Sequence, residues 1–231
     1  MKKNVMMRIA ACLLVCVLAS TCGISGTFAK YVTSDSSTDT ARVAKWGVTV
    51  TAENDTMFGS AYVSADGTVS TTYNAATDSV HAENGTDYVV APGTNGKLSA
   101  ITIEGKPEVD VKVEYVGTVD LANWTVDGAF YCPLVFVITD RDGNVEATID
   151  GSTYAEETVL EAAIATFINN FSAEYEANTD LSTVEDGSLN ISWQWPFYVS
   201  DDRDVKDTAL GDAATAATIK IDISCTVTQI D

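Results

Sequence analysis

The sequence predicts a mainly β protein, a jelly-roll-like antiparallel β-sandwich with one amphipathic helix inserted at about residues 153–175. Apolar and polar residues alternate along several short segments, as they do in strands that bury one face. Turns rich in Gly, Asn and Asp separate these segments, a spacing typical of sandwiches and jelly rolls. One run instead has apolar residues at intervals of three and four, the period of a helix packed on one side.

The first 29 residues have the organisation of a secretory signal peptide. Basic residues precede an apolar run at 9–19, and small residues follow it. This run has 11 residues, whereas a membrane-spanning helix needs about 20, so a retained anchor is not expected. The tripeptide "TFA" predicts that a signal peptidase cleaves between Ala29 and Lys30. Lipid attachment at Cys22 is the alternative, and the residues before that cysteine disfavour it.

The segment 30–43, which would follow cleavage, is expected to be extended and polar. Tyr31 and Val32 near its start and Val43 at its end are its large apolar residues, and Ser, Thr and Asp dominate between them. Turn-separated segments then continue to the end of the chain, so a single domain is expected at 44–231.

Strands are expected wherever the alternation or the β-forming composition is sustained. The segments are 46–51, 58–63, 68–73, 88–91, 98–103, 109–115, 130–139, 189–198 and 217–230. In the last segment Ile219, Ile221, Ile223, Cys225 and Val227 share one face.

The segment 189–198 is rich in aromatic residues. Trp193, Trp195 and Phe197 alternate and would share one face, which fits a sandwich core better than a carbohydrate-binding platform. Pro196 predicts that this strand lies at an edge or contains a bulge, because proline cannot donate to a sheet.

The predicted helix follows a capping-box pattern at 153–156. Its apolar residues recur every three or four positions and are Leu160, Ile164, Phe167, Ile168, Phe171 and Tyr175. We expect this helix to lie across one end or one face of the sandwich.

The mature chain would be strongly acidic. Cleavage removes three of the 13 basic residues and none of the 33 acidic ones, which leaves a net charge of −23 over 202 residues. Such a surface repels nucleic acid and anionic lipid, so neither is an expected partner, and no membrane contact is expected after processing. Salt and divalent cations should favour self-association because they screen like-charged copies.

Two of the five cysteines, Cys132 and Cys225, would remain after cleavage. Each lies on the apolar face of a predicted strand. In an exported protein the pair can form one disulfide, and two buried thiols that act as small hydrophobic residues are the equal alternative.

The sequence contains little that catalysis would need. His81 is the only histidine, which excludes a zinc site built on two histidines, and a surface-loop position is expected for it. The segment 140–150 opens like a calcium loop, but its twelfth position is Gly151 instead of the required Glu, so a hairpin turn is expected. At 200–212, weak surface Ca²⁺ binding is the alternative to a solvated loop. We expect no catalytic residue, no metal site, no cofactor and no enzyme activity.

Short motifs over most of the mature chain carry a family resemblance. They are "GTFAKY" at 26–31, "AKWGVTVTA" at 44–52, "APGTNGKLSAITIEG" at 91–105, and "WQWPF" with "KDTALGD" within 193–212. In these motifs the chain resembles the TasA/CalY, or camelysin-like, family of exported biofilm-matrix fibre proteins.

The resemblance implies a secreted structural subunit that a dedicated signal peptidase processes. Such subunits polymerise head to tail with themselves, or together with other matrix subunits, in the extracellular matrix or at the surface of a Gram-positive-type bacterium. Fibres of this family grow by donor-strand addition. The implied donor is 30–43, with Lys30, Tyr31, Val32 and Val43 as candidate contacts.

Two other classes of function compete with this one. The first is a monomeric cell-surface adhesin or ligand-binding β-sandwich. The second, more distant, is the metallopeptidase activity attributed to some camelysin-like members, for which the single histidine leaves no recognisable set of zinc ligands.

Overall fold

The structure is a computed structural model, and it describes residues 42–52, 57–70 and 73–230. The predicted signal peptide, its cleavage site at Ala29 and Lys30, and the candidate contacts Tyr31 and Val32 lie outside the described residues. The chain divides into two compact units, Met1–Arg42 and Val43–Asp231. The second unit carries the fold described here.

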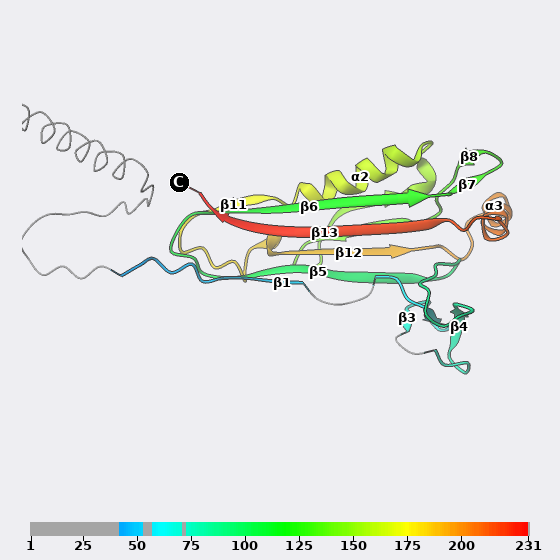
Figure 1. Cartoon of the computed structure of the whole chain (residues 1–231), viewed down its shortest axis with the longest axis horizontal. Helices are drawn as coiled ribbons and strands as arrows, with labels where there is room; N and C mark the ends of the chain where they lie inside the picture. Colours follow the sequence, from blue (N-terminus) through cyan, green and yellow to red (C-terminus); the bar gives the residue numbers. More distant parts are fainter. Residues whose placement is uncertain (1–41, 53–56, 71–72, 231) are drawn as a thin grey trace, which may run out of the picture. The chain divides into compact units, whose positions relative to one another are not determined.

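Residues 43–230 form an antiparallel β-sandwich, which confirms the predicted fold class (Figure 1). One layer is a five-stranded sheet with the order β1 (Val48–Ala52), β5 (Asn95–Gly105), β12 (Ser188–Gln194), β9 (Val135–Thr139) and β10 (Val145–Asp150). The other layer contains a three-stranded sheet with the order β11 (Ala173–Tyr175), β6 (Val111–Ala122) and β13 (Thr218–Gln229).

Two small sheets and two short helical turns complete the strand framework. The small sheets are β3 (Val69–Ser70), β2 (Ala61–Val63) and β4 (Asp78–His81), and the hairpin of β7 (Thr125–Val126) with β8 (Ala129–Phe130). The 3₁₀ turns are η1 (Gly151–Thr153) and η2 (Glu185–Gly187).

The core lies between the two main sheets, where inward-facing residues of both are buried. Tyr115 of β6 is 1% exposed and its hydroxyl donates to the carbonyl of Ile101 on β5, at 3.3 Å. Trp193 of β12 is 2% exposed, and its indole N–H donates to the carbonyl of Met57 at 2.7 Å. These two bonds satisfy polar groups that would otherwise be costly to bury.

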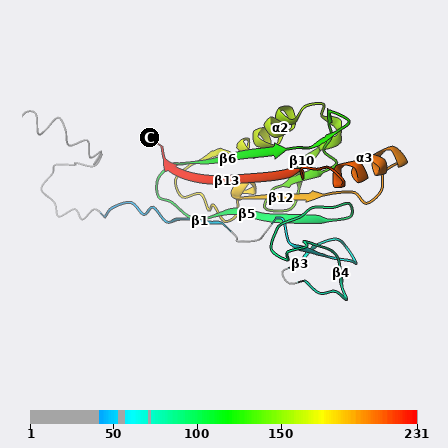
Figure 2. The same ribbon diagram turned by 45° about the vertical axis from the view of Figure 1, so that its right-hand side comes forward.

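The helix α2 (Glu157–Asn169) continues the second layer beside β6, on the side of β6 away from β13 (Figures 1 and 2). Leu160, Ile164 and Ile168 form its buried face. Gly117 of β6 permits the close approach, because a Cβ atom there would lie only 2.5 Å from Cδ1 of Ile168.

The predicted helix was too long at both ends. The expected capping box at 153–156 does not form, because η1 ends at Thr153 and the N-cap Glu156 makes no side-chain capping bond. At the other end, Phe171 lies beyond the helix and Tyr175 belongs to β11. The apolar spacing continued past the true end because these residues pack against the same core.

A second helix, α3 (Asp201–Gly211), occupies most of the segment that was expected to be a solvated loop. Its hydroxyl cap is Ser200, whose side chain accepts a hydrogen bond from the Arg203 amide. Aspartates fill the first turn, where they stabilise the positive end of the helix dipole.

The aromatic strand prediction was wrong at its end. β12 is a central strand and stops at Gln194, before Pro196. Proline cannot donate to the neighbouring strands of a central position, so the chain leaves the sheet there. Phe197, expected in the core, is 77% exposed as a result.

Other strand boundaries also differ from the predicted ones. The segments 58–63 and 88–91 contain only β2 and isolated bridges at Gly59 and Val89, whereas β4, β10 and β11 were not predicted. The hairpin turn predicted for 140–150 is confirmed for residues 140–144, which connect β9 to β10, whereas residues 145–150 form β10 itself. No helix within the described residues has the length and apolarity needed to cross a membrane.

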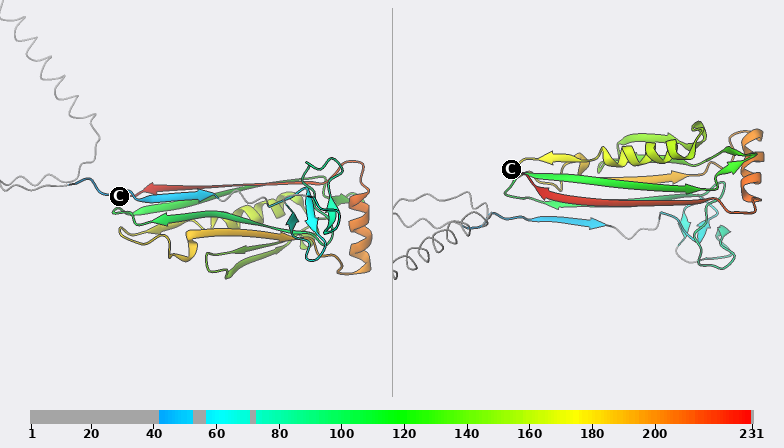
Figure 3. Two further views of the ribbon diagram at one scale, coloured as in Figure 1. Left: turned by 90° about the horizontal axis from the view of Figure 1, so that it is seen from below. Right: turned by 45° about the horizontal axis from the view of Figure 1, so that its top comes forward.

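The two ends of this unit are distinct (Figure 3). At one end the Lys45 amide donates to the Glu108 carboxylate, and the Ile230 amide donates to the carbonyl of Asp110. We call this the Lys45 end. At the other, α3 contacts β7, and the Trp124 indole donates to the carbonyl of Thr218. We call this the α3 end. β13 therefore runs from the α3 end to the Lys45 end.

Candidate functional site: the open edge of β13

The longest exposed sheet edge in the described part of the chain belongs to β13. This strand has 12 residues and pairs with β6 along its full length, without a bulge. Its sheet contains no strand on the other side of β13 among the described residues. At about 3.3 Å per residue, the open edge is about 40 Å long.

The apolar side chains of β13 point towards the core but remain half-buried. They are the five identified from the alternation, Ile219, Ile221, Ile223, Cys225 and Val227. Their partners across the pair on β6 include Leu121, Tyr115 and Val113, which are 2%, 1% and 0% exposed. The two strands have the same alternation, and the difference in burial follows from the lack of a further neighbour of β13 among the described residues.

The other side of β6 is covered by β11 and by residues on and after α2. β11 pairs with the first residues of β6. Beyond β11, polar side chains on and after α2 accept the β6 amides. Ser172 Oγ accepts from Tyr115 at 3.0 Å, Asn169 Oδ1 from Gly117 at 3.0 Å, and Glu161 Oε1 from Leu121 at 2.7 Å.

These bonds establish which backbone groups of β13 face outward. The amides of Tyr115, Gly117 and Leu121 point away from β13, so these residues exchange no ladder bonds with it. In an antiparallel pair, opposite residues share this property. Their partners Cys225, Ile223 and Ile219 therefore direct their N–H and C=O groups away from β6.

By the same alternation, Ile221 and Val227 also present their backbone groups at the open side. The residues with half-buried apolar side chains are thus the ones whose backbone groups are available for pairing. An extended segment laid along this side would gain main-chain hydrogen bonds and cover these side chains together.

β1 lies on the same side of the sandwich. It is the edge strand of the five-stranded sheet and contacts β13. Its side chains are mostly exposed, and Val50 is 41% exposed. Within residues 42–52, 57–70 and 73–230, the open side of the sandwich is therefore bordered by one edge strand from each layer.

The two remaining cysteines are free thiols in this structure, and only one belongs to the open edge. Cys132 is fully buried, and burial raises the pKa of its thiol to about 12. Cys225 is half-buried on β13, where burial raises the pKa of its thiol to about 11 and a hydrogen bond with Tyr115 lowers it by less.

Other residues singled out in the sequence lie away from this edge. Val43 is described and is 91% exposed. His81 lies on β4, not in a loop, and its ring stacks on Tyr73 with centroids 4.1 Å apart. Within the described residues, no cluster of three or more His, Cys, Asp or Glu side chains has the arrangement to hold a metal ion.

The open edge itself was not predicted, although its strand was. The alternation in β13 predicts a strand with one buried face, and β6 has the same pattern. No sequence signal distinguishes a strand with two neighbours from a strand with one.

Comparison of the chain with models of protein families, with curated proteins and with solved structures finds no match.

Proposed function

We propose that this protein is a secreted structural subunit that polymerises into extracellular matrix fibres. In this proposal, residues 30–43 of one copy, freed by signal cleavage, pair with the open edge of β13 in the next. The observation that carries the proposal is this edge, 12 residues long, regular, and lined by half-buried apolar side chains.

The length of the donor segment supports the pairing. Residues 30–43 span about 46 Å when extended, and the β13 edge is about 40 Å long. A donor of this length reaches along the whole strand and leaves a short connection to its own β1, which begins at Val48.

The chemistry of the donor is compatible with an edge that mainly offers backbone groups. Ser and Thr dominate the middle of the segment, and main-chain hydrogen bonds do not depend on side-chain identity. Tyr31, Val32 and Val43 would supply the apolar contacts. Each completed hydrogen bond contributes about 1 kcal/mol, so a ladder of several is needed for a stable joint.

Contact through two different surfaces of each copy produces an open chain. The donor segment and the β13 edge are distinct surfaces, so the contact is heterologous and does not close a dimer. The high negative charge opposes such assembly, and added salt or divalent cations would favour it by screening.

The test compares mature protein beginning at Lys30 with a variant that lacks residues 30–40. We expect the parent to sediment as filaments visible by negative-stain microscopy and the deletion variant to remain a folded monomer. A synthetic peptide of residues 30–43 should bind the deletion variant, and a scrambled peptide should not. Equal sedimentation of both proteins would contradict the proposed donor, and absence of filaments at any salt concentration would contradict the fibre function.

A further inference from the structure

An exposed apolar cluster lies at the α3 end. Its members are Phe197, Tyr198, Val199 and Val205, which are 77%, 62%, 51% and 69% exposed. We call them the α3-end patch. The first three form one run between the end of β12 and the start of α3, where solvent-exposed aromatic residues have no role in the core. Clustered exposed apolar residues are typical of interaction surfaces.

One hydrogen bond joins the loop part of the patch to the helix. The Tyr198 hydroxyl donates to the Asp201 carboxylate at 2.8 Å. Asp201 and Val205 are one helical turn apart, so they share one face of α3. Phe197 lies over Gly93, where an added Cβ atom would be 3.0 Å from its ring.

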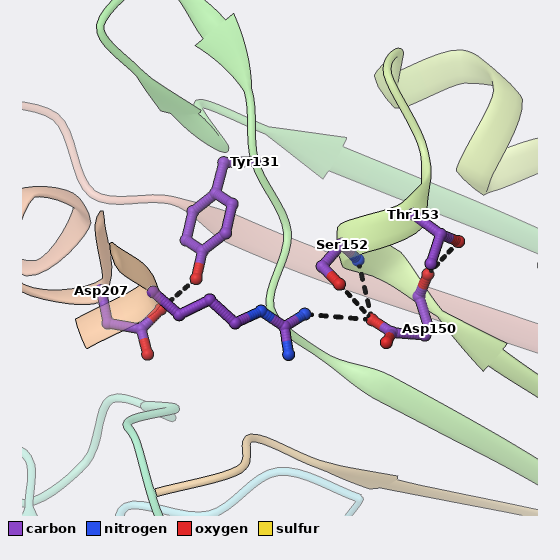
Figure 4. Close-up of polar contacts among 6 residues, drawn as sticks. Tyr131, Asp150, Ser152, Thr153 and Asp207 are labelled. Atoms are coloured by element: carbon purple, nitrogen blue, oxygen red, sulfur yellow. Dashed lines mark hydrogen bonds and ion pairs between the residues drawn. The ribbon is translucent and has the colours of Figure 1, made fainter. Parts of the chain in front are cut away.

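The element beneath the patch is fixed to the sandwich (Figure 4). The Tyr131 hydroxyl donates to the Asp207 carboxylate at 2.6 Å, and Arg203 pairs with Asp150 at 3.3 Å. Leu210 near the end of α3 is 4% exposed. These contacts hold α3 in a defined position, so the patch is a preorganised surface that loses little entropy on binding.

The direction of β13 determines what a donor-strand neighbour would place against this patch. A donor antiparallel to β13 has its Lys30 at the Lys45 end and its Val43 at the α3 end. The body of the incoming copy then begins at the α3 end. A parallel donor would instead bring the two Lys45 ends together.

Both arrangements repeat one contact at every joint, but only the antiparallel one places the two neighbours of a copy at its opposite ends. In it, the Lys45 end of each copy meets the α3 end of the copy before it, and its own α3 end stays free for the next. In the parallel arrangement both neighbours of a copy would crowd its Lys45 end.

We propose, on the basis of the fibre function proposed above, that the α3-end patch is a second contact between successive copies. Its occupant is the Lys45 end of the incoming copy. That end presents Trp46, which is 42% exposed, next to the basic Lys45. The α3 side presents aromatic residues next to Asp201, Asp202 and Asp204 of its first turn. An aromatic contact flanked by opposite charges suits this pairing.

The test compares Val205→Glu with Val159→Glu. Both replace an exposed valine on a helix by glutamate, and Val159 on α2 is 51% exposed and is not a member of the patch. We expect Val205→Glu to raise the concentration for half-maximal polymerisation about tenfold, while Val159→Glu leaves it near the parent value. Peptide binding is measured on proteins that lack residues 30–40. In this form both variants should bind the 30–43 peptide as tightly as the parent sequence does.

Unchanged polymerisation of Val205→Glu with normal peptide binding would overturn the patch while leaving the donor strand in place. Loss of peptide binding in the parent would overturn the donor strand, and the patch with it. A second experiment reads the polarity directly in a Cys225→Ser background. Filaments carrying Lys45→Cys and Val205→Cys should cross-link into ladders, whereas cross-linking by Lys45→Cys alone would show the parallel arrangement and contradict the proposal.

Discussion

The two edges of the three-stranded sheet differ in how they end. On the β6 side, β11 pairs with the first residues, and Ser172, Asn169 and Glu161 accept the amides that follow. On the β13 side, the described residues provide no strand. On the inward face of β6, Val111, Val113, Tyr115 and Leu121 are buried and Val119 is half-buried, whereas the five inward apolar residues of β13 are all half-buried. β13 therefore has the apolar residues of a core strand, but within the part of the chain that the structure describes it has a neighbour on one side only.

Proteins usually protect a free edge with a bulge, a proline, inward-facing charge or a short strand. β13 has a regular register over 12 residues, and its inward face is apolar from Ile219 to Val227. Lys220 on the outward face forms an ion pair with Asp222 instead of guarding the edge. The comparison with β6 therefore supports a strand-shaped partner for β13.

Proline substitutions at neighbouring positions of β13 should produce the largest contrast. Asp222→Pro removes an amide that bonds to β6 and should lower the free energy of unfolding by about 3 kcal/mol. Ile223→Pro removes an amide that faces outward, so the monomer should stay folded while polymerisation is lost. Urea unfolding and sedimentation measure the two effects. Equal destabilisation by both prolines would show that the assignment of outward backbone groups is wrong.

Filling the space at Gly117 tests how closely α2 covers the edge of β6. Gly117→Ala places a methyl group 2.5 Å from Ile168, and we expect a loss of about 2 kcal/mol in unfolding free energy. Gly211→Ala at the end of α3 is the control, because a Cβ atom there meets nothing within 4 Å. It should be neutral or slightly stabilising. If Gly117→Ala matched the control in thermal unfolding, α2 would not be packed as described.

The polar bonds that close the edge of β6 should contribute less than the packing. Glu161→Ala leaves the Leu121 amide without its acceptor and should cost about 1 kcal/mol. Glu161→Gln retains an acceptor oxygen and should unfold at nearly the parent urea concentration. If the alanine and glutamine variants were equally stable, the bond would contribute nothing to closing this edge.

The smallest effect concerns reactivity and not stability. Thiol labelling of the folded monomer should be slow at pH 8 and should accelerate as the pH approaches 11, because the thiolate reacts and the pKa of Cys225 is raised to about 11. Cys132 should stay unlabelled throughout as the internal control, because it is fully buried. In filaments Cys225 labelling should slow further. Faster labelling in filaments than in monomers would mean that β13 is not covered by assembly.

The strands of the fold could be predicted from sequence where alternation is long. β6, β12 and β13 all have a complete apolar face, and the structure contains all three. The apolar alternation continues through Phe197, yet the strand ends before Pro196. Proline therefore predicts the end of this strand better than the alternation does. The helix ran too long for a related reason, since Phe171 keeps the helical spacing while packing from the following turn.

The helix α3 and the open edge could not be read from apolar periodicity. α3 is polar over most of its surface and buries Leu210, so its only local signals are the Ser200 cap and the acidic first turn. The open edge depends on which strands become neighbours across long stretches of chain. β6 and β13 are about 100 residues apart in sequence. The sequence of neither strand indicates whether a further strand lies beside β13.

Lys45, near the start of the described chain, lies beside the end of β13. This position affects whether β13 pairs with the leading segment of its own copy or with that of a neighbour. Since Lys45 and Ile230 lie at the same end, the copy's own leading segment can reach β13 only by folding back, which makes it parallel to that strand. A neighbour's segment can lie antiparallel, the pairing that is slightly more stable per residue. The tethered segment has the advantage of a high local concentration. Under the proposed function, a self-closed subunit would therefore predominate in dilute solution and would yield to chain growth as the subunit concentration rises.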